Sequence, residues 1–593
     1  MKAMLMQPAR LLRLVAAALV CACCWPSSAQ EADPALRTYF QQYLKECFRQ
    51  RPLDATRWGD HSSDHLLDDL SPKARAAWIE HDRKTLQELP PRVDLKGLSR
   101  PAAIDAEIFA HELTKSLWLA ENVRRFEEDP RVYNEYISDS VFLLLAQPTV
   151  LKETNITHCI ARMAQIPKIV AAARANLRNP PQVDTETAIR QNRGALDFYQ
   201  RGLFELAGQT PQLGVLKTAA EPVVACLNDY QRFLEQELLP RAKGTWRIGR
   251  EKFARKLELE LDAGVTAEQV LADAQLEFAR VERDMYVIAR QLWSRYYPQR
   301  PLPPDDAAGQ HITIRKVLRA VAQEHGRPED LARDARATAA RIKTFIADND
   351  ILRLPQPDRC QIIEMPEFQR GNSTAFLNPA PPLDDKAISI YAVSPPPKDW
   401  DALRVNSLLE EYNRHLLQIL TIHEAYPGHY VQLAYANRQP SLVRRVLASG
   451  VYMEGWAVYT EQMMLDQGYG QRDLALRLTQ LKFYLRAVTN AILDYQLHCT
   501  AMSDDEALEL LMQRAFQSEG EARLKIIRAK QTSCQLSTYF VGRMAMVRLR
   551  RQIQNALGER FDLGRYHEAV LEQGSVPVKY LPELVLQRLQ TPR

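Results

Sequence analysis

Apolar residues recur at three- and four-residue spacing along most of this chain. The clearest case is VTAEQVLADAQLEFARVERDMYVIARQLW, residues 265–293, where the spacing places the apolar side chains on one helix face. Thr266 and Gln269 match a capping box, which satisfies the free amides at a helix start. Proline clusters mark loops between such segments. The pattern predicts helices through nearly all of residues 30–350.

Residues 351–398 follow a different pattern. The runs RCQIIEMP, STAFLNP and AISIYAV favour β structure and are separated by proline, glycine and aspartate. They predict a ribbon or sheet of about two to four strands. Helical spacing returns at about 399 and continues almost to residue 593. The sequence therefore predicts a mostly α protein with one small β element, in which residues 30–593 form one compact unit.

Composition and charge exclude several classes of protein. The chain has 593 residues, with 46% apolar and 25% charged, as in a globular protein with a sizeable core. A formal charge of +4 gives no reason to expect a nucleic acid or an acidic lipid surface as partner. No segment after the N-terminus is long and apolar enough for an integral membrane span. The sequence does not indicate an oligomeric state.

The first 29 residues, MKAMLMQPARLLRLVAAALVCACCWPSSA, resemble a secretory signal peptide. A basic start precedes an apolar run that is too short to span a bilayer, and Ser27-x-Ala29 is a suitable cleavage site. We therefore predict export, to the periplasm. VCAC at 20–23 is a weaker match to a lipoprotein cleavage box, so lipid anchoring at Cys23 is the alternative.

One apolar region carries residues that need a chemical explanation. In TIHEAYPGHYVQ, residues 421–432, His423 and Glu424 stand between the apolar runs HLLQILTI and YVQLAYA. An ionised glutamate in such surroundings is costly unless it has a partner. A metal ion is one such partner. A salt bridge or a hydrogen-bonded core histidine is the alternative, because short motifs often match by chance.

The spacing of the histidines departs from that of a regular zinc helix, H-E-x-x-H. Pro427 occupies the place of the second histidine, and His429 follows two residues later. Residues six apart are separated by about 240° around a regular helix and about 9 Å along it. Both histidines then cannot reach one ion at about 2.1 Å. Because proline and glycine bend or end helices, we predict that Pro427 and Gly428 return His429 to the side of His423.

A third ligand is expected from a separate helix. Glu454 lies within the largely apolar stretch VYMEGWAVYTEQMM, 25 residues after His429, which leaves room for a loop and an antiparallel helix. Two imidazoles and a carboxylate are a usual donor set for Zn²⁺, although these ligand types also accept manganese or cobalt. Glu461 shares the helix face of Glu454. It is expected behind the ligands or as an alternative ligand, and a solvated surface position is equally consistent with the sequence.

Four stretches together resemble the bacterial domain-of-unknown-function family 885: LLEEYNRHLLQILTIHEAYPGHYVQ, EGWAVYTE, LDYQLHCTAMSDDEAL and QLSTYFVGR. The likeness covers roughly residues 35–590, and its most specific parts are H-E-x-x-P-G-H and E-G-W-A-x-Y. It implies a gluzincin-like metallopeptidase whose large multi-helix bundle encloses a deep cleft, with the 351–398 sheet beside the active site. One departure is that the family often has Pro-Gly-Gln where this chain has TSCQLSTY.

Zinc hydrolysis also needs a base and a stabiliser of the developing negative charge. Glu424 is the candidate base, and later the acid that protonates the leaving amine. Tyr539 and His498 are candidate donors to the oxyanion, and for each a hydrogen-bonded core position is an equal alternative. Asp494 lies one helical turn before His498 and could orient it.

The sequence thus predicts an exported zinc-dependent metallopeptidase acting on short peptides, with His423, His429 and Glu454 as metal ligands. One alternative is a metal-dependent hydrolase of a non-peptide amide or ester. The other is a catalytically inactive peptide-binding or scaffold protein, although a binder needs no base such as Glu424. The C-terminal helical region also holds arginines that could clamp a substrate carboxylate, none preferred over the others: Arg523, Arg528 and Arg543.

Overall fold

The structure is a computed structural model that describes residues 33–146, 149–365, 375–398 and 400–590. The predicted signal peptide, residues 1–29, and the alternative anchoring site at Cys23 lie outside the described residues. Within the described ranges, no helix has both the length and the apolar character needed to cross a membrane.

Helices follow one another from Pro34 to Asp348, which confirms the prediction for this part of the chain. The capping box is also present: Gln269 N donates to Thr266 Oγ1 at 3.2 Å, and Thr266 N donates to Gln269 Oε1 at 2.9 Å. The helices of this part are α1 (Pro34–Gln50), α2 (Pro52–Trp58), α3 (Pro72–Arg92), α4 (Arg100–Asn122), α5 (Arg125–Glu128), α6 (Arg131–Ala146), α7 (Lys152–Met163), α8 (Ile166–Asn176), α9 (Gln182–Asp197), α10 (Leu203–Ala207), α11 (Leu213–Arg232), α12 (Arg250–Leu261), α13 (Ala267–Tyr296), α14 (Ala307–Ala322) and α15 (Leu331–Asp348).

The predicted β element is a three-stranded mixed sheet of β1 (Cys360–Glu364), β2 (Ala375–Asn378) and β3 (Ser389–Val393). The strand order is β1-β3-β2, with β1 parallel and β2 antiparallel to β3. Cys360 is paired with Ser389, and Ala375 with Val393. Strand β2 is therefore an edge strand of the sheet, and it contacts the helix that carries the H-E pair.

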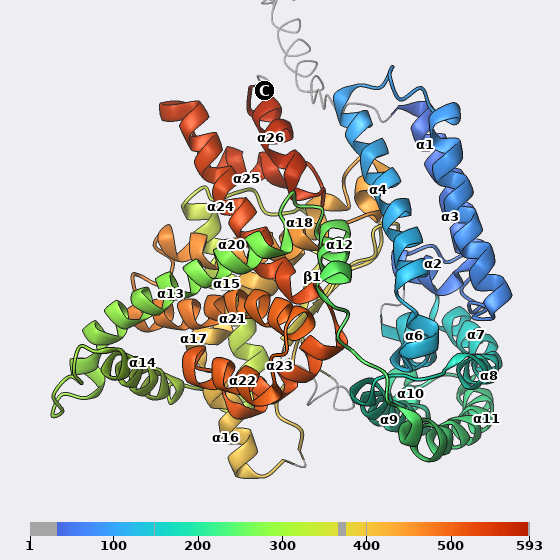
Figure 1. Ribbon diagram of the computed structural model, residues 1–593, viewed down its shortest axis with the longest axis horizontal. Coiled ribbons are helices and arrows are strands. Elements are labelled where there is room, and N and C mark those ends of the chain that lie inside the picture. The colour runs from blue at the N-terminus through green and yellow to red at the C-terminus, as the bar shows by residue number, and fades with distance from the viewer. Residues whose placement is uncertain (1–32, 147–148, 366–374, 399, 591–593) are drawn as a thin grey trace, which may run out of the picture.

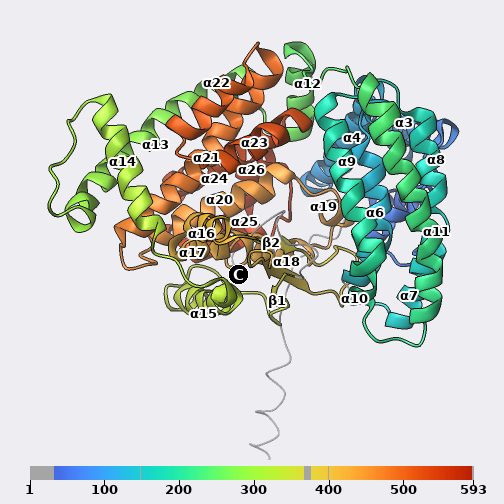
Figure 2. The same ribbon diagram turned by 90° about the horizontal axis from the view of Figure 1, so that it is seen from below.

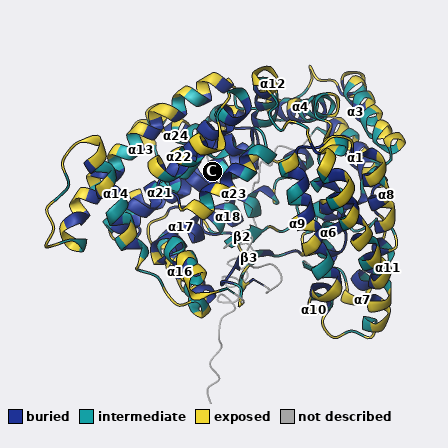
Figure 3. Ribbon diagram, turned by 60° about the horizontal axis from the view of Figure 1, so that its bottom comes forward, coloured by how far each residue is buried: buried dark blue, intermediate teal, exposed yellow. Residues whose placement is uncertain are grey.

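The chain is helical again after the sheet, as predicted. Two of these helices, α20 and α21, bury residues on nearly all sides, as expected for helices that are apolar all round. Figure 3 shows the buried residues of α21 inside the molecule and exposed residues along the outer faces of α7 and α11. The helices of this part are α16 (Ala402–Glu411), α17 (Arg414–Glu424), α18 (His429–Ala436), α19 (Leu442–Val446), α20 (Gly450–Asp466), α21 (Leu474–Cys499), α22 (Asp504–Glu509), α23 (Glu519–Gln531), α24 (Thr538–Leu557), α25 (Leu563–Leu571) and α26 (Leu581–Gln590).

Two large hydrophobic clusters hold these helices together. One lies within residues 67–239 and is built mainly by α6–α11. The other joins residues 36–113 to residues 253–585, so the first helices share a core with the C-terminal ones. Figures 1 and 2 show α6–α11 on one side of the molecule and α13–α17 with α20–α24 on the other. The H-E helix belongs to the second cluster.

Candidate metal centre

The helix that carries the H-E pair is interrupted where the sequence predicts a distortion. Helix α17 ends at Glu424 and α18 begins at His429. Gly428 N donates to the Ile422 carbonyl at 3.0 Å, which folds the chain back against α17. A Cβ atom at Gly428 would lie only 1.9 Å from the His423 carbonyl oxygen, so this close approach needs glycine. The predicted break is confirmed.

This break brings together the three side chains predicted as ligands. The ring centroids of His423 and His429 lie 4.7 Å apart. Glu454 Oε2, from α20, lies 3.7 Å from His423 Nε2 and 3.5 Å from His429 Nε2. One potential donor atom from each residue falls within 4.8 Å of the other two. In the part of the chain that the structure describes, no other group of histidine, cysteine and acidic side chains converges in this way.

The donor set fits a tetrahedral cation. Donor atoms at about 2.1 Å from a tetrahedral zinc ion lie about 3.4 Å from one another, close to the two separations measured from Glu454 Oε2. Glu454 Oε2 is buried and has no hydrogen-bond partner among the described residues. Because buried polar atoms normally have a partner, a cation at this point would satisfy the carboxylate.

Glu454 is positioned by a close crossing of α20 and α24. A Cβ at Gly455 would lie 2.3 Å from the Gly542 carbonyl carbon, so the two helix backbones touch at these glycines. Tyr539 lies one helical turn before Gly542, and Glu454 directly precedes Gly455. The crossing therefore brings Tyr539 to the side of the metal centre. Burial raises the pKa of Tyr539, and the negative charge of Glu454 acts in the same direction.

Glu461 lies directly behind His423. Its side chain is fully buried, and its Oε1 lies 2.7 Å from His423 Nδ1. A carboxylate in this place holds the proton on Nδ1 and leaves Nε2 free to bind a metal. Of the alternatives that the sequence leaves open, the structure favours the supporting position and excludes a solvated surface position.

We expect Glu461→Gln to lower the affinity for zinc by about 10- to 100-fold, because the amide no longer orients the His423 ring as the carboxylate does. Competition with a zinc-binding dye measures this affinity. Asp466→Asn, an exposed position on the same helix, is the matched control and should leave the affinity unchanged. Equal affinities of Glu461→Gln and the unmodified chain would contradict the supporting role.

Glu424 is held beside the three ligands by the sheet. Its Oε2 accepts a hydrogen bond from Leu377 N, on the edge strand β2, at 3.0 Å. This contact places the sheet at the candidate site. Burial raises the pKa of Glu424 to about 7, with a further contribution from the charge of Glu454. A fixed carboxylate with a pKa near neutrality can both accept and return a proton.

Of the three candidate arginines, only Arg528 contacts a residue of the candidate site. Its Nη2 donates to Tyr539 Oη at 3.1 Å. Arg543 is buried and lies 3.1 Å from Glu277 Oε1, where it serves packing between helices. Arg523 is exposed and pairs with Glu519 on its own helix at 2.7 Å.

The structure does not bring His498 to the metal centre, which corrects the prediction of a catalytic role. His498 Nε2 lies 2.8 Å from the Ala529 carbonyl oxygen, and its ring stacks on Phe253 with centroids 5.9 Å apart. Phe483, whose ring centroid lies 6.0 Å from that of His423, is on the same helix α21, fifteen residues earlier. Fifteen residues extend about 22 Å along a helix, which places His498 far from the ligands.

Asp494 does not orient His498 either. Its carboxylate accepts hydrogen bonds from Cys534 N at 3.0 Å, Ser537 N at 3.1 Å and Ser537 Oγ at 2.8 Å. These bonds fix the turn that precedes α24 and hence the start of the helix that carries Tyr539. Cys534 in this turn has φ +71°, a left-handed conformation that favours glycine. This turn is also where the sequence departs from the Pro-Gly-Gln pattern.

Sequence reasoning missed two residues of the site, Leu377 and Phe483. The run STAFLNP predicts a strand, but no sequence feature shows that its edge amide reaches Glu424. Phe483 is one of many large side chains along α21 and has no distinguishing signal in the sequence.

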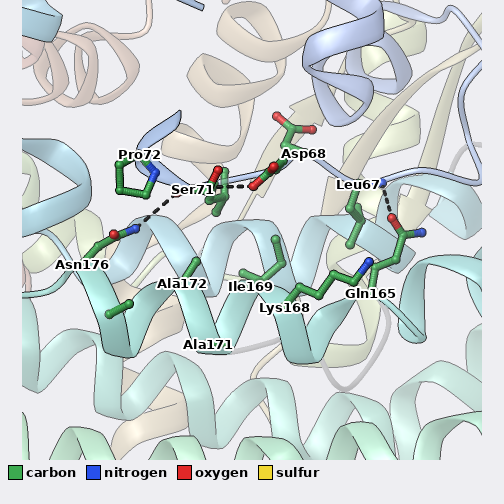
Figure 4. A pocket seen from close by; sticks show the side chains of 13 residues that line it. Leu67, Asp68, Ser71, Pro72, Gln165, Lys168, Ile169, Ala171, Ala172 and Asn176 are labelled. Atoms are coloured by element: carbon green, nitrogen blue, oxygen red, sulfur yellow. Dashed lines mark hydrogen bonds between the residues drawn. The ribbon is translucent and has the colours of Figure 1, made fainter. Parts of the chain in front are cut away.

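One cavity of the molecule lies away from the metal centre. It has a volume of about 450 Å³ and is lined by residues 67–72 and by α8 with Gln165 before it. Figure 4 shows Leu67, Asp68, Ser71 and Asn176 around it. None of the residues that line it belongs to α17, α18 or α20, so it is not the cleft expected around the metal centre. That cleft stays a prediction.

Two solved structures are similar to this chain over nearly its whole length. A protein from Shewanella oneidensis, described as "a putative lipoprotein of unknown function", has 29% identity and a TM-score of 0.78, covering 93% of this chain and 99% of its own. A "putative lipoprotein" from Colwellia psychrerythraea has 20% identity and a TM-score of 0.75, covering 93% and 98%, and shows the common fold. No curated protein matches. The model of the family "Bacterial protein of unknown function (DUF885)" matches residues 52–585, and the chain therefore belongs to this family.

Proposed function

We propose that this protein is a zinc-dependent metallopeptidase that hydrolyses short peptides. The observation that carries the proposal is the convergence of His423, His429 and Glu454 from three helices, with Glu424 beside them and Glu461 behind. A structural metal site needs no carboxylate held next to its ligands. A hydrolytic one does, because a proton must leave the attacking water.

The residues of the chain divide the chemistry between them. His423, His429 and Glu454 would hold zinc, which polarises a substrate carbonyl and lowers the pKa of a coordinated water. Glu424 takes the proton from the attacking water and delivers it to the leaving amine. Tyr539 donates its hydroxyl proton in a hydrogen bond to the oxygen on which negative charge develops.

The sheet supports a peptide as the substrate. Strand β2 is paired with β3 on one side, and its other edge faces Glu424 through the Leu377 amide. An extended peptide bound along such an edge would lie beside the metal centre. The resemblance to gluzincin-like metallopeptidases supports the same class of reaction.

We further propose that the protein is exported to the periplasm. The signal-like character of residues 1–29 supports export, and each of the two similar structures is described as a "putative lipoprotein". In the alternative to a free periplasmic protein, a lipid attached to Cys23 anchors the exported protein to a membrane.

Metal analysis combined with a substrate panel tests the proposed function. The purified protein should contain stoichiometric zinc and cleave short peptides. Chelation should remove both metal and activity, and added zinc should restore them. The panel includes non-peptide amides and esters. Preferential cleavage of these compounds would indicate a metal-dependent hydrolase other than a peptidase. A zinc-containing protein that cleaves nothing in the panel would favour a binding or scaffold role.

A further inference from the structure

Basic side chains gather on one side of the metal centre. We call Arg486, Lys525 and Arg528 the basic cluster. The Arg486 guanidinium carbon lies 5.3 Å from the ring centroid of Phe483, and that ring centroid lies 6.0 Å from the centroid of His423. Arg486 and a candidate metal ligand therefore both lie near the same aromatic ring.

The cluster also adjoins the candidate oxyanion donor. Arg528, on α23, donates to Tyr539 Oη at 3.1 Å. Arg486, on α21, interacts electrostatically with the same hydroxyl group. Lys525 lies one turn before Arg528 on α23 and interacts electrostatically with both arginines. The three basic residues thus lie close enough to act on one another, and Arg528 contacts Tyr539 directly.

Lys525 is the unusual member of the cluster. It is only 8% exposed, and it has no hydrogen bond or ion pair with any described residue. Lysine is rarely buried to this extent without a partner. Burial, followed by the positive charges of Arg486 and Arg528, lowers the pKa of Lys525 well below its usual range. Glu521 opposes this effect at longer range without forming an ion pair, and an anion bound at this point would act in the same direction.

The carboxylates nearest the cluster form an ion pair with only one of its members. Glu411 pairs with Lys482 at 2.9 Å, and Glu521 pairs with Arg486 at 3.1 Å. Among the described residues, no ion pair joins Lys525 or Arg528 to a carboxylate, although Glu521 and Glu454 act on them at longer range. Hydrogen-bond donors without an ion-pair partner favour a ligand that carries a carboxylate.

We propose that the basic cluster binds the C-terminal carboxylate of the substrate, so that the enzyme cleaves peptides close to their carboxyl end. This inference rests on the proposed function and adds the direction of cleavage to it. Successive Cα atoms are about 3.8 Å apart, so a carboxylate one or two residues beyond the cleaved bond lies about 4–8 Å from it. The Arg486 guanidinium carbon lies no more than about 11 Å from the His423 ring centroid, a distance that the longer span and one hydrogen bond can cover.

The test compares a short peptide with its C-terminal amide, which is identical except that the negative charge is absent. The unmodified protein should cleave the free acid at least about 10-fold more efficiently, measured as kcat/KM. Lys525→Met keeps the length of the side chain and removes its charge. It should lower kcat/KM for the acid by about 10- to 100-fold, mainly through KM, and leave the amide unchanged.

Two further measurements separate binding and folding from catalysis. In the Glu424→Gln background, calorimetry should show tighter binding of the acid than of the amide, and Lys525→Met should remove the difference. Arg523→Met, an exposed cation on the same helix, is the matched control and should change neither substrate. The acid–amide comparison in the unmodified chain needs no substitution, so it holds even if Lys525→Met fails to fold.

The outcomes distinguish this inference from the proposed function. Equal cleavage and equal binding of the acid and the amide would overturn the inference but not the proposed function. The same result is expected if the protein recognises a side-chain carboxylate of the substrate instead of the C-terminal one. Failure to cleave any peptide, acid or amide, would overturn the proposed function and with it the direction of cleavage.

Discussion

Glu424→Gln should reduce peptide hydrolysis by about 10²- to 10⁴-fold while the protein keeps its metal. The glutamine side chain has the same shape and can still accept the hydrogen bond from Leu377 N, so the local structure should persist. It cannot take a proton from water. Because Glu424 is not one of the three converging ligands, zinc content should remain that of the unmodified chain.

The measurement combines metal analysis with kcat/KM for a cleaved peptide on both proteins. The control is the same substitution at an exposed glutamate outside the candidate site, Glu329→Gln, which should retain full activity. A Glu424→Gln protein that stays active would show that another group accepts the proton. Loss of the metal in this variant would instead show that Glu424 acts as a ligand.

Gly428→Ala should disrupt the break between α17 and α18 and with it the metal centre. The added Cβ would lie 1.9 Å from the His423 carbonyl oxygen and 2.3 Å from that of Ile422. Both obstacles are backbone atoms, so no side-chain rotation relieves the overlap. We expect the free energy of unfolding to fall by more than about 4 kcal/mol, in the range reserved for severe core defects.

Chemical denaturation measures this change, and the zinc-binding dye reports the metal affinity of the same protein. Gly450→Ala is a matched control, because a Cβ at Gly450 meets open space at the start of α20. Its stability should change by no more than about 1 kcal/mol. If Gly428→Ala were as stable as Gly450→Ala and bound zinc normally, the tight turn would not be what holds His429 beside His423.

Local rules were enough for most of the fold. The three- and four-residue spacing predicts α13 and its capping box, and the change of pattern at 351–398 predicts the sheet. These features depend on residues close together in the chain. Local rules did not predict that residues 36–113 share a core with the C-terminal helices, because that packing depends on contacts between distant segments.

The candidate site divides in the same way. His423, Glu424, His429 and Glu454 were found from residue type and from apolar surroundings, since an ionisable group in such a place requires a partner. His498 was misassigned for a related reason: its surroundings are also apolar, but its partner is a backbone carbonyl on α23. Residue type alone does not show whether a buried imidazole binds a metal or donates a hydrogen bond to a backbone carbonyl.

By itself, the sequence determined which buried ionisable residues need a partner and where the H-E helix must break. Both follow from local features, namely the pattern of apolar residues and the proline–glycine pair. Only the tertiary structure decided which partners those residues meet. The contact of Gly455 with Gly542, the reach of Leu377 to Glu424 and the unpaired Lys525 all arise where helices or strands far apart in the chain pack together. The geometry of such contacts is fixed by packing over the whole core, which no short stretch of sequence encodes.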